Sequence, residues 1–206
     1  MLKSIEYPYA HLHAQLDQGV LILSIDRAEA KNALNMDLYI NLRQAICEAD
    51  QASEVRVLIL RGVDQDFSAG NDMQSFFQLP ELPQAGQAGS TPPFMLLKAT
   101  AEFSKPCIAA VRGACIGVAN TLLLHFDFVY ADNTATFQMP FVSLGLSLEG
   151  AASLLLVQRA GYHLAADILL SAKKYDAHKA LEAGIINEVV DNPYESATAQ
   201  AEHLAS

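Results

Sequence analysis

A single carboxylate, Glu149, lies in the segment LGLSLEGAAS (144–153), whose other residues are apolar or small. It is the only charged residue between Asp132 and Arg159, although 17% of the chain is charged. A carboxylate in an apolar pocket has a raised pKa and can serve as a general base near neutral pH. The alternative is an acidic residue at a helix N-terminus, exposed to solvent and stabilised by the helix dipole.

Two segments of small residues could bind an anionic oxygen through the backbone. They are DFSAGNDM (66–73) and VRGACIGVANTL (111–122), and each follows a predicted strand. Small side chains let a ligand approach the main chain, and N–H groups at a turn or helix start can point at an anion. A turn that caps a helix also explains the first segment, and close helix packing also explains Gly117.

The elements around these segments alternate between strands and helices. The β-branched runs 19–26 and 55–62 predict strands covered on both faces. Residues 36–50 place Leu38, Leu42, Ala45, Ile46 and Ala49 on one helical stripe, with Asn35 or Asp37 as the N-cap. Further helices are expected at 94–103, 117–125, 150–160, 162–171 and 176–182, further strands at 106–111, 127–131, 135–140 and 186–190, and a surface loop at 78–93. This order predicts a single α/β domain with ligands in the loops after strand ends.

Composition and charge exclude several classes of function. With 13 Lys and Arg against 23 Asp and Glu, the net charge is −10, and no basic run is present. This argues against binding of nucleic acid or of an anionic membrane surface. Cys47, Cys107 and Cys115 have no metal-ligand spacing, so we expect buried free thiols, no metal site and a cytoplasmic protein without a signal peptide. No nucleotide-binding fingerprint is present, so no dinucleotide or ATP cofactor is expected.

Four segments together resemble the crotonase, or enoyl-CoA hydratase/isomerase, superfamily. They are DRAEAKNALN (26–35), VLILRGVDQDFSAGND (57–72), residues 105–150 and LEAGIINEVV (181–190), and they occur in order over nearly the whole chain. The resemblance implies an α/β spiral of β-β-α turns over 1–190 in one domain, 1–206. It also implies that 191–206 begins a shortened C-terminal helical region, that the substrate is an acyl-CoA thioester, and that the protein forms homo-oligomers, as trimers.

By this resemblance, two backbone N–H groups hold the thioester oxygen, and the matching residues are Ala69 and Val118. Preorganised amides of this kind stabilise the enolate oxygen, each by roughly 3–4 kcal/mol. Because the donors are backbone groups, Val118 is acceptable where many relatives carry Gly. The other substrate-binding residues expected at these junctions are Ser68, Gly70, Asn71, Asp72 and Gly117.

The segment RAEAKNA (27–33) resembles the part of the family that contacts the adenosine end of CoA. Ala28, Ala30 and Lys31 are therefore candidate contacts, and Lys31 could meet a phosphate. A solvated loop lysine is the alternative for Lys31.

The acid and base groups indicate which reaction to expect. Hydratases of this superfamily use two glutamates, and the matching positions here are Thr121 and Phe141. Glu149 instead matches the single glutamate of the 3,2-trans-enoyl-CoA isomerase branch. One base can move a proton from the α to the γ carbon through a dienolate, which converts a 3-enoyl-CoA into a 2-enoyl-CoA without a further cofactor. A dienoyl-CoA isomerase, a hydratase-like enzyme and a non-catalytic acyl-CoA-binding module are the alternatives.

Overall fold

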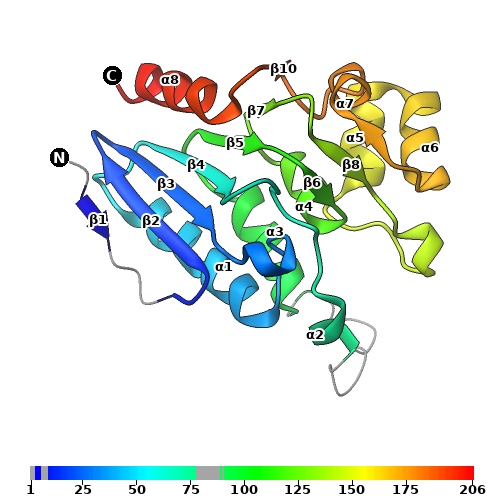
Figure 1. Ribbon diagram of the computed structural model, residues 1–206, viewed down its shortest axis with the longest axis horizontal. Coiled ribbons are helices and arrows are strands. Elements are labelled where there is room, and N and C mark those ends of the chain that lie inside the picture. Colours follow the sequence, from blue (N-terminus) through cyan, green and yellow to red (C-terminus); the bar gives the residue numbers. More distant parts are fainter. Residues whose placement is uncertain (1–2, 6–8, 78–88, 90) are drawn as a thin grey trace.

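The computed structural model describes residues 3–5, 9–77, 89 and 91–206, which form two β-sheets with helices around them (Figure 1). The larger sheet has seven strands in the order β1-β2-β3-β4-β5-β7-β10, and the smaller has three in the order β6-β8-β9. The larger sheet contains β1 (Lys3–Ile5), β2 (Leu12–Asp17), β3 (Val20–Ile25), β4 (Val57–Gly62), β5 (Cys107–Val111), β7 (Phe128–Ala131) and β10 (Glu188–Val189). The smaller contains β6 (Ala114–Ile116), β8 (Thr136–Gln138) and β9 (Tyr175–Asp176).

Helices cover both faces of the larger sheet. The helices are α1 (Met36–Gln51), α2 (Met73–Phe77), α3 (Pro92–Ala101), α4 (Val118–Leu123), α5 (Ala152–Ala160), α6 (Tyr162–Ser171), α7 (Ala177–Glu182) and α8 (Pro193–Ala205), with two 3-10 turns, η1 (Ala28–Ala30) and η3 (Val142–Leu144). Helix α8 packs on β3, β4, β5 and β7, while α1 and α3 lie on the opposite side (Figure 1). Within the described ranges, no helix is both long and apolar enough to cross a membrane.

The central strands are buried on both faces, as the sequence predicts. All six residues of β3 are buried, and β3 pairs in parallel with β4, with Leu23 opposite Leu60. Alternate residues enter two separate cores, because Leu21 and Leu23 pack toward α1 whereas Val20 and Ile22 pack toward α8. This explains why the strands read as continuous apolar runs.

Helix α1 confirms the predicted stripe. Leu38, Leu42, Ala45, Ile46 and Ala49 are all buried. The N-cap is Asn35, whose side chain accepts a hydrogen bond of 2.9 Å from the Leu38 N–H. The same helix corrects one prediction, because Cys47 is exposed, whereas Cys107 and Cys115 are buried as expected.

The chain passes repeatedly between the two sheets, which gives the predicted spiral. From β5 it enters β6 of the smaller sheet, returns through α4 to β7, and enters the smaller sheet again at β8. The fold is therefore α/β with β-β-α turns in one domain. Helix α8 occupies most of the segment 191–206, which was expected to begin a helical region.

Some elements differ from those predicted. Strand β2 was not expected, although its sequence LHAQLD alternates apolar and polar residues, and it pairs antiparallel with β3. Of the predicted loop 78–93, residues 78–88 and 90 lie outside the described residues, and Pro92 and Pro93 open helix α3 instead. Proline is tolerated in the first helical turn because the N–H that it lacks would have no partner there.

Candidate active site

The two small-residue segments lie side by side. The Ser68 N–H donates to Ala114 O at 2.8 Å, and the Ile116 N–H donates to Ser68 O at 3.1 Å. Gly70 has a φ of +82°, and a Cβ built on it would lie 2.3 Å from Ile116 O. Only glycine therefore permits this approach, which brings the turn after β4 against the start of α4.

The prediction that the Ala69 N–H is an oxyanion donor is wrong. Its backbone N–H already donates to Lys31 O at 2.9 Å, so it is not available to a ligand. In the same turn, the Gly70 N–H donates to Ser68 Oγ at 3.1 Å, and the Asp72 N–H donates to Leu34 O at 2.9 Å. The Asn71 N–H has no hydrogen-bond acceptor among the described residues, which makes Asn71 the available donor of this turn.

The structure leaves the N–H of the other predicted donor, Val118, available to a ligand. Val118 is the first residue of α4, and Gly117 before it adopts φ +59° and ψ −122°. In the described part of the chain, the Val118 N–H has no acceptor, as is usual at a helix start. The Val118 side chain is fully buried in the core, so its size does not obstruct the position of the N–H. We call the N–H groups of Asn71 and Val118, with the two turns that carry them, the amide half of the site.

Glu149 lies opposite α4, in the irregular stretch before α5. It is half-buried, and its carbonyl accepts from the Ala152 N–H, so it precedes the helix rather than beginning it. The Thr121 hydroxyl lies 3.3 Å from Glu149 Oε1. A Cβ added to Gly150 would meet Thr121 Cβ at 3.1 Å, so this stretch packs directly on α4. We call Glu149 and Thr121 the base half of the site.

Burial determines the charge state of Glu149. It raises the pKa of Glu149 to about 7, and the hydrogen bond from Thr121 opposes part of this rise. Both the acid and the carboxylate are therefore accessible near neutral pH, which suits a group that accepts and returns a proton.

Tyr39 on α1 links the two halves. It is fully buried, and its hydroxyl donates to Asn71 Oδ1. Burial and the negative charge of Glu149 raise the pKa of Tyr39 well above its usual range, which places Glu149 within electrostatic reach of this contact. No motif in the sequence pointed to Tyr39. The only signal was a tyrosine on the buried stripe of α1, where a hydroxyl needs a polar partner.

The remaining candidates of the first turn have structural partners. Ser68 is buried, and its hydroxyl donates to Asn32 O at 2.8 Å while it accepts from Gly70. Asp72 Oδ1 accepts from the N–H groups of Gln74 and Ser75 at the start of α2, and Oδ2 pairs with Arg27 at 2.6 Å. Asp72 therefore caps α2, and it is not positioned as a substrate ligand.

The segment expected to contact CoA borders a cavity of about 360 Å³. Ala28 and Lys31 line it together with Asn32 and residues 63–66, whereas Ala30 does not. Lys31 is exposed and adopts φ +52°. The buried Asn32 amide donates to Val63 O and Asp66 O, which fixes the shape of the cavity wall.

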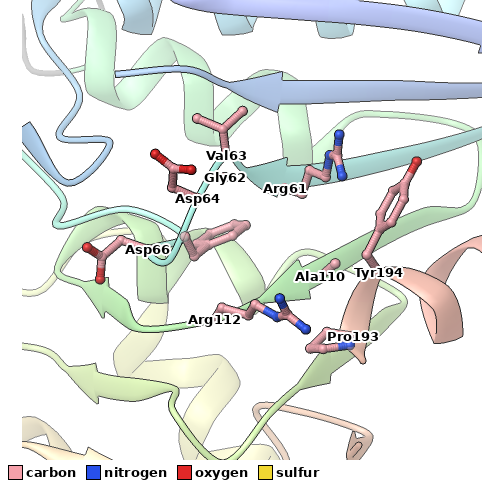
Figure 2. Close-up of a pocket in the computed structure, with 10 residues that line it drawn as sticks. Arg61, Gly62, Val63, Asp64, Asp66, Ala110, Arg112, Pro193 and Tyr194 are labelled. Atoms are coloured by element: carbon pink, nitrogen blue, oxygen red, sulfur yellow. The ribbon is translucent and has the colours of Figure 1, made fainter. Parts of the chain in front are cut away.

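A second cavity of about 180 Å³ lies between the ends of β4 and β5 and the start of α8. Figure 2 shows Arg61, Arg112 and Tyr194 on one side of it and Asp64 and Asp66 on the other. The Arg61 guanidinium lies 4.1 Å from the centre of the Tyr194 ring, and Arg112 Nε pairs with Asp132 at 3.0 Å. The Arg61 contact fastens α8 to β4, and the Arg112 pair joins the chain after β5 to the chain after β7.

Comparison with known proteins identifies the family. The family model for enoyl-CoA hydratase/isomerase matches residues 15–206, which is nearly the whole chain. The chain belongs to the crotonase family. Among solved structures, this crotonase is similar to an Acinetobacter baumannii protein provisionally named enoyl-CoA hydratase/isomerase, with 54% identity, a TM-score of 0.89 and coverage of 95% of this chain and 80% of the other.

Curated relatives of this crotonase carry different activities. It is 32% identical to human enoyl-CoA delta isomerase 2, over 84% of this chain and 44% of the human protein. It is also 32% identical to 1,2-epoxyphenylacetyl-CoA isomerase of Escherichia coli, over 94% of this chain and 75% of that protein. Other relatives with about 30% identity are named as a hydratase and a decarboxylase, so similarity alone leaves the reaction open. The chain spans less than half the length of the human relative.

Proposed function

We propose that this crotonase is an enoyl-CoA isomerase that moves the double bond of a 3-enoyl-CoA to the 2,3 position. The observation that carries the proposal is the half-buried Glu149 beside a fully buried Thr121. Thr121 and Phe141 stand where hydratases of the family have their two glutamates. With one carboxylate in place of two, the site is suited to moving a proton within the substrate and not to activating a water.

In the proposed reaction, the Glu149 carboxylate removes a proton from the carbon α to the thioester. The electron pair of that C–H bond forms a dienolate, whose negative charge lies on the thioester oxygen. The N–H groups of Asn71 and Val118 would hold that oxygen, because neither has another acceptor among the described residues. The Glu149 acid then returns the proton to the γ carbon, which leaves the double bond at the 2,3 position and regenerates the carboxylate.

The CoA moiety is proposed to bind along the first turn. The cavity beside Ala28 and Lys31 borders residues 63–66, which lead directly into the turn that carries Asn71. An adenosine group in this cavity would therefore extend its pantetheine arm toward the amide half. The exposed Lys31 ammonium is the basic group of that wall, and it suits a phosphate in a chain of net charge −10.

A homo-oligomer, as a trimer, is part of the proposal. Several large apolar side chains of η3, α5 and α6 are exposed, among them Leu144, Leu154, Tyr162 and Leu170. Exposed apolar residues on neighbouring elements are typical of subunit contacts. Light scattering coupled to gel filtration would give a mass three times that of the chain, and a monomer would remove this part of the proposal.

A panel of two substrates tests the reaction. Purified protein is incubated with 3-hexenoyl-CoA and, separately, with crotonyl-CoA, and the products are separated by chromatography. The isomerase predicts 2-hexenoyl-CoA from the first and little hydration of the second. Faster hydration of crotonyl-CoA would favour a hydratase-like enzyme, and thioester binding without turnover would favour a non-catalytic acyl-CoA-binding module.

A further inference from the structure

Thr121 offers one hydroxyl proton to two acceptors. Its Oγ1 lies 3.2 Å from Val118 O within α4 and 3.3 Å from Glu149 Oε1. The Thr121 side chain is fully buried, so water does not reach its hydroxyl. A hydroxyl donates one hydrogen bond and accepts up to two, so it cannot donate fully to both oxygens at once.

Glu149 Oε1 can accept the Thr121 hydroxyl proton in both protonation states of the carboxyl group. While Glu149 is ionised, its oxygens can only accept, and the Thr121 hydroxyl donates to Oε1. When Glu149 takes the substrate proton on Oε2, Oε1 remains a carbonyl oxygen that can only accept, so the Thr121 hydroxyl still donates to it and the new O–H stays available to the γ carbon.

We propose that Thr121 is a positioning residue that keeps the Glu149 carboxyl group in one orientation both before and after it takes the substrate proton. This inference rests on the proposed role of Glu149 as the base. Thr121 also lies one helical turn after Val118, so the same turn of α4 carries an oxyanion donor and the support of the base. A Cβ added to Gly150 would lie 3.1 Å from Thr121 Cβ, so a larger residue at position 150 would press on Thr121.

Three other titratable or charged groups face this region and bear on its pH dependence. Tyr39 on α1 remains neutral, because burial and the Glu149 charge raise its pKa well above its usual range. His125, after α4, is half-buried and donates from Nε2 to Gly150 O at 3.0 Å. Burial lowers the pKa of His125, and Arg159 on α5 lowers it further. A His125→Gln variant therefore separates its titration from that of Glu149.

The test compares Thr121→Val with Thr121→Ser. Valine has the shape of threonine without the hydroxyl, whereas serine keeps the hydroxyl. Titration of the Glu149 carboxyl carbon by NMR, in protein labelled at glutamate, reads the pKa without any need for turnover. We expect Thr121→Val to raise the midpoint by about half to one pH unit, and Thr121→Ser to stay within about 0.3 unit of the wild type.

Kinetics provide the second readout. In Thr121→Val, the acid limb of kcat/KM for 3-hexenoyl-CoA should move to higher pH by the same amount, and kcat should fall about 3- to 10-fold with little change in KM. The matched control is Thr100→Val, because Thr100 is a buried threonine whose hydroxyl donates to Leu96 O within α3. Thr100→Val should shift neither the NMR midpoint of Glu149 nor the midpoint of the acid limb of kcat/KM.

Equal Glu149 midpoints in the wild type and Thr121→Val would overturn the inference. Failure of the proposed function looks different, because wild-type protein would then not convert 3-hexenoyl-CoA, whatever the NMR titration shows. If Thr121→Val does not fold, the inference is tested with Thr121→Ala. That variant also lacks the hydroxyl, and an unchanged midpoint in it would have the same meaning.

Discussion

The amide half and the base half of the site are held in different ways. The amide half is fixed by main-chain hydrogen bonds between segments that are distant in sequence, such as Ala69 to Lys31 and Ser68 to Ala114. The base half depends on one side chain, Glu149, with one side-chain hydrogen bond from Thr121. Side-chain identity therefore matters little for the N–H donors, as Val118 illustrates, whereas it determines whether a base is present.

This difference predicts which kinds of change should disturb each half. The amide half should fail when the backbone cannot adopt its conformation or when two segments cannot approach each other. The base half should respond to pH and to changes that preserve the fold. The following substitutions separate the two responses.

Gly70→Ala should have the largest effect, because it damages the amide half and the fold together. The new Cβ would lie 2.3 Å from Ile116 O, at a backbone φ of +82°. We expect a loss of about 3 kcal/mol or more in the free energy of unfolding, and no measurable isomerase activity. Denaturant titration and the 3-hexenoyl-CoA assay check both.

The control for this substitution is Gly145→Ala. Gly145 also has a positive φ, +70°, but an added Cβ would meet nothing within 4 Å. Backbone strain alone should cost about 1 kcal/mol. If the two variants lost equal stability, the close approach of the two turns would not be the reason for glycine at position 70.

The pH dependence of the rate tests the base half. Because burial raises the pKa of Glu149 to about 7, kcat/KM should fall about tenfold for each pH unit well below 7 and level off above about pH 8. A flat profile between pH 5 and 8 would contradict a base with this pKa. The measurement is a series of initial rates with 3-hexenoyl-CoA.

Whereas kcat/KM should rise with pH, the contribution of Glu149 to the free energy of unfolding should fall. The pKa of Glu149 is higher in the folded protein than its ordinary value of 4.5, so folding favours the protonated form. Its contribution is present below pH 4.5 and is lost as pH rises through about 7. Relative to Glu149→Gln, the wild type should lose roughly 2–3 kcal/mol of unfolding free energy between pH 4.5 and 7.5. Parallel pH curves for the two proteins would contradict the burial of this carboxyl group.

Ser68→Ala should have a smaller effect than Gly70→Ala, and it tests how far the amide half depends on side chains. The change removes the donor to Asn32 O and leaves the Gly70 N–H without its acceptor. We expect a loss of about 1–2 kcal/mol in stability and at most a tenfold fall in kcat, because the main-chain bonds of the turn remain. A fall beyond a hundredfold would show that this hydroxyl, and not the main chain, holds the amide half.

The sequence predicted the two halves unequally, and the reason is physical. Glu149 and Val118 were named through the resemblance to the superfamily, because an isolated charge and a glycine before a helix each also have a purely structural explanation. The donor in the first turn was assigned wrongly to Ala69, because the bond that occupies its N–H comes from Lys31 in a distant segment. Asn71 can be recognised as the donor only when that tertiary contact is known. In the same way, Tyr39 can be recognised only from its contact with Asn71.

More of the fold than of the site could be predicted from the sequence, because most elements follow from hydrophobic periodicity. The exposed Cys47 could have been recognised, because it does not belong to the buried stripe of α1. Strand β2 could also have been recognised, because LHAQLD alternates apolar and polar residues, which is typical of a strand with one buried face. Its antiparallel pairing with β3 could not. Pairing partners are a tertiary property, which local patterns do not contain.

The central claim, that Glu149 is the single base of the site, is tested most directly with Glu149→Gln. The amide has the same shape but does not accept a proton, and it should not perturb the main-chain donors. We predict that kcat/KM for 3-hexenoyl-CoA falls by about 10³-fold, while the Kd for a saturated acyl-CoA changes less than about threefold. Equal turnover by the variant and the wild type would contradict the account.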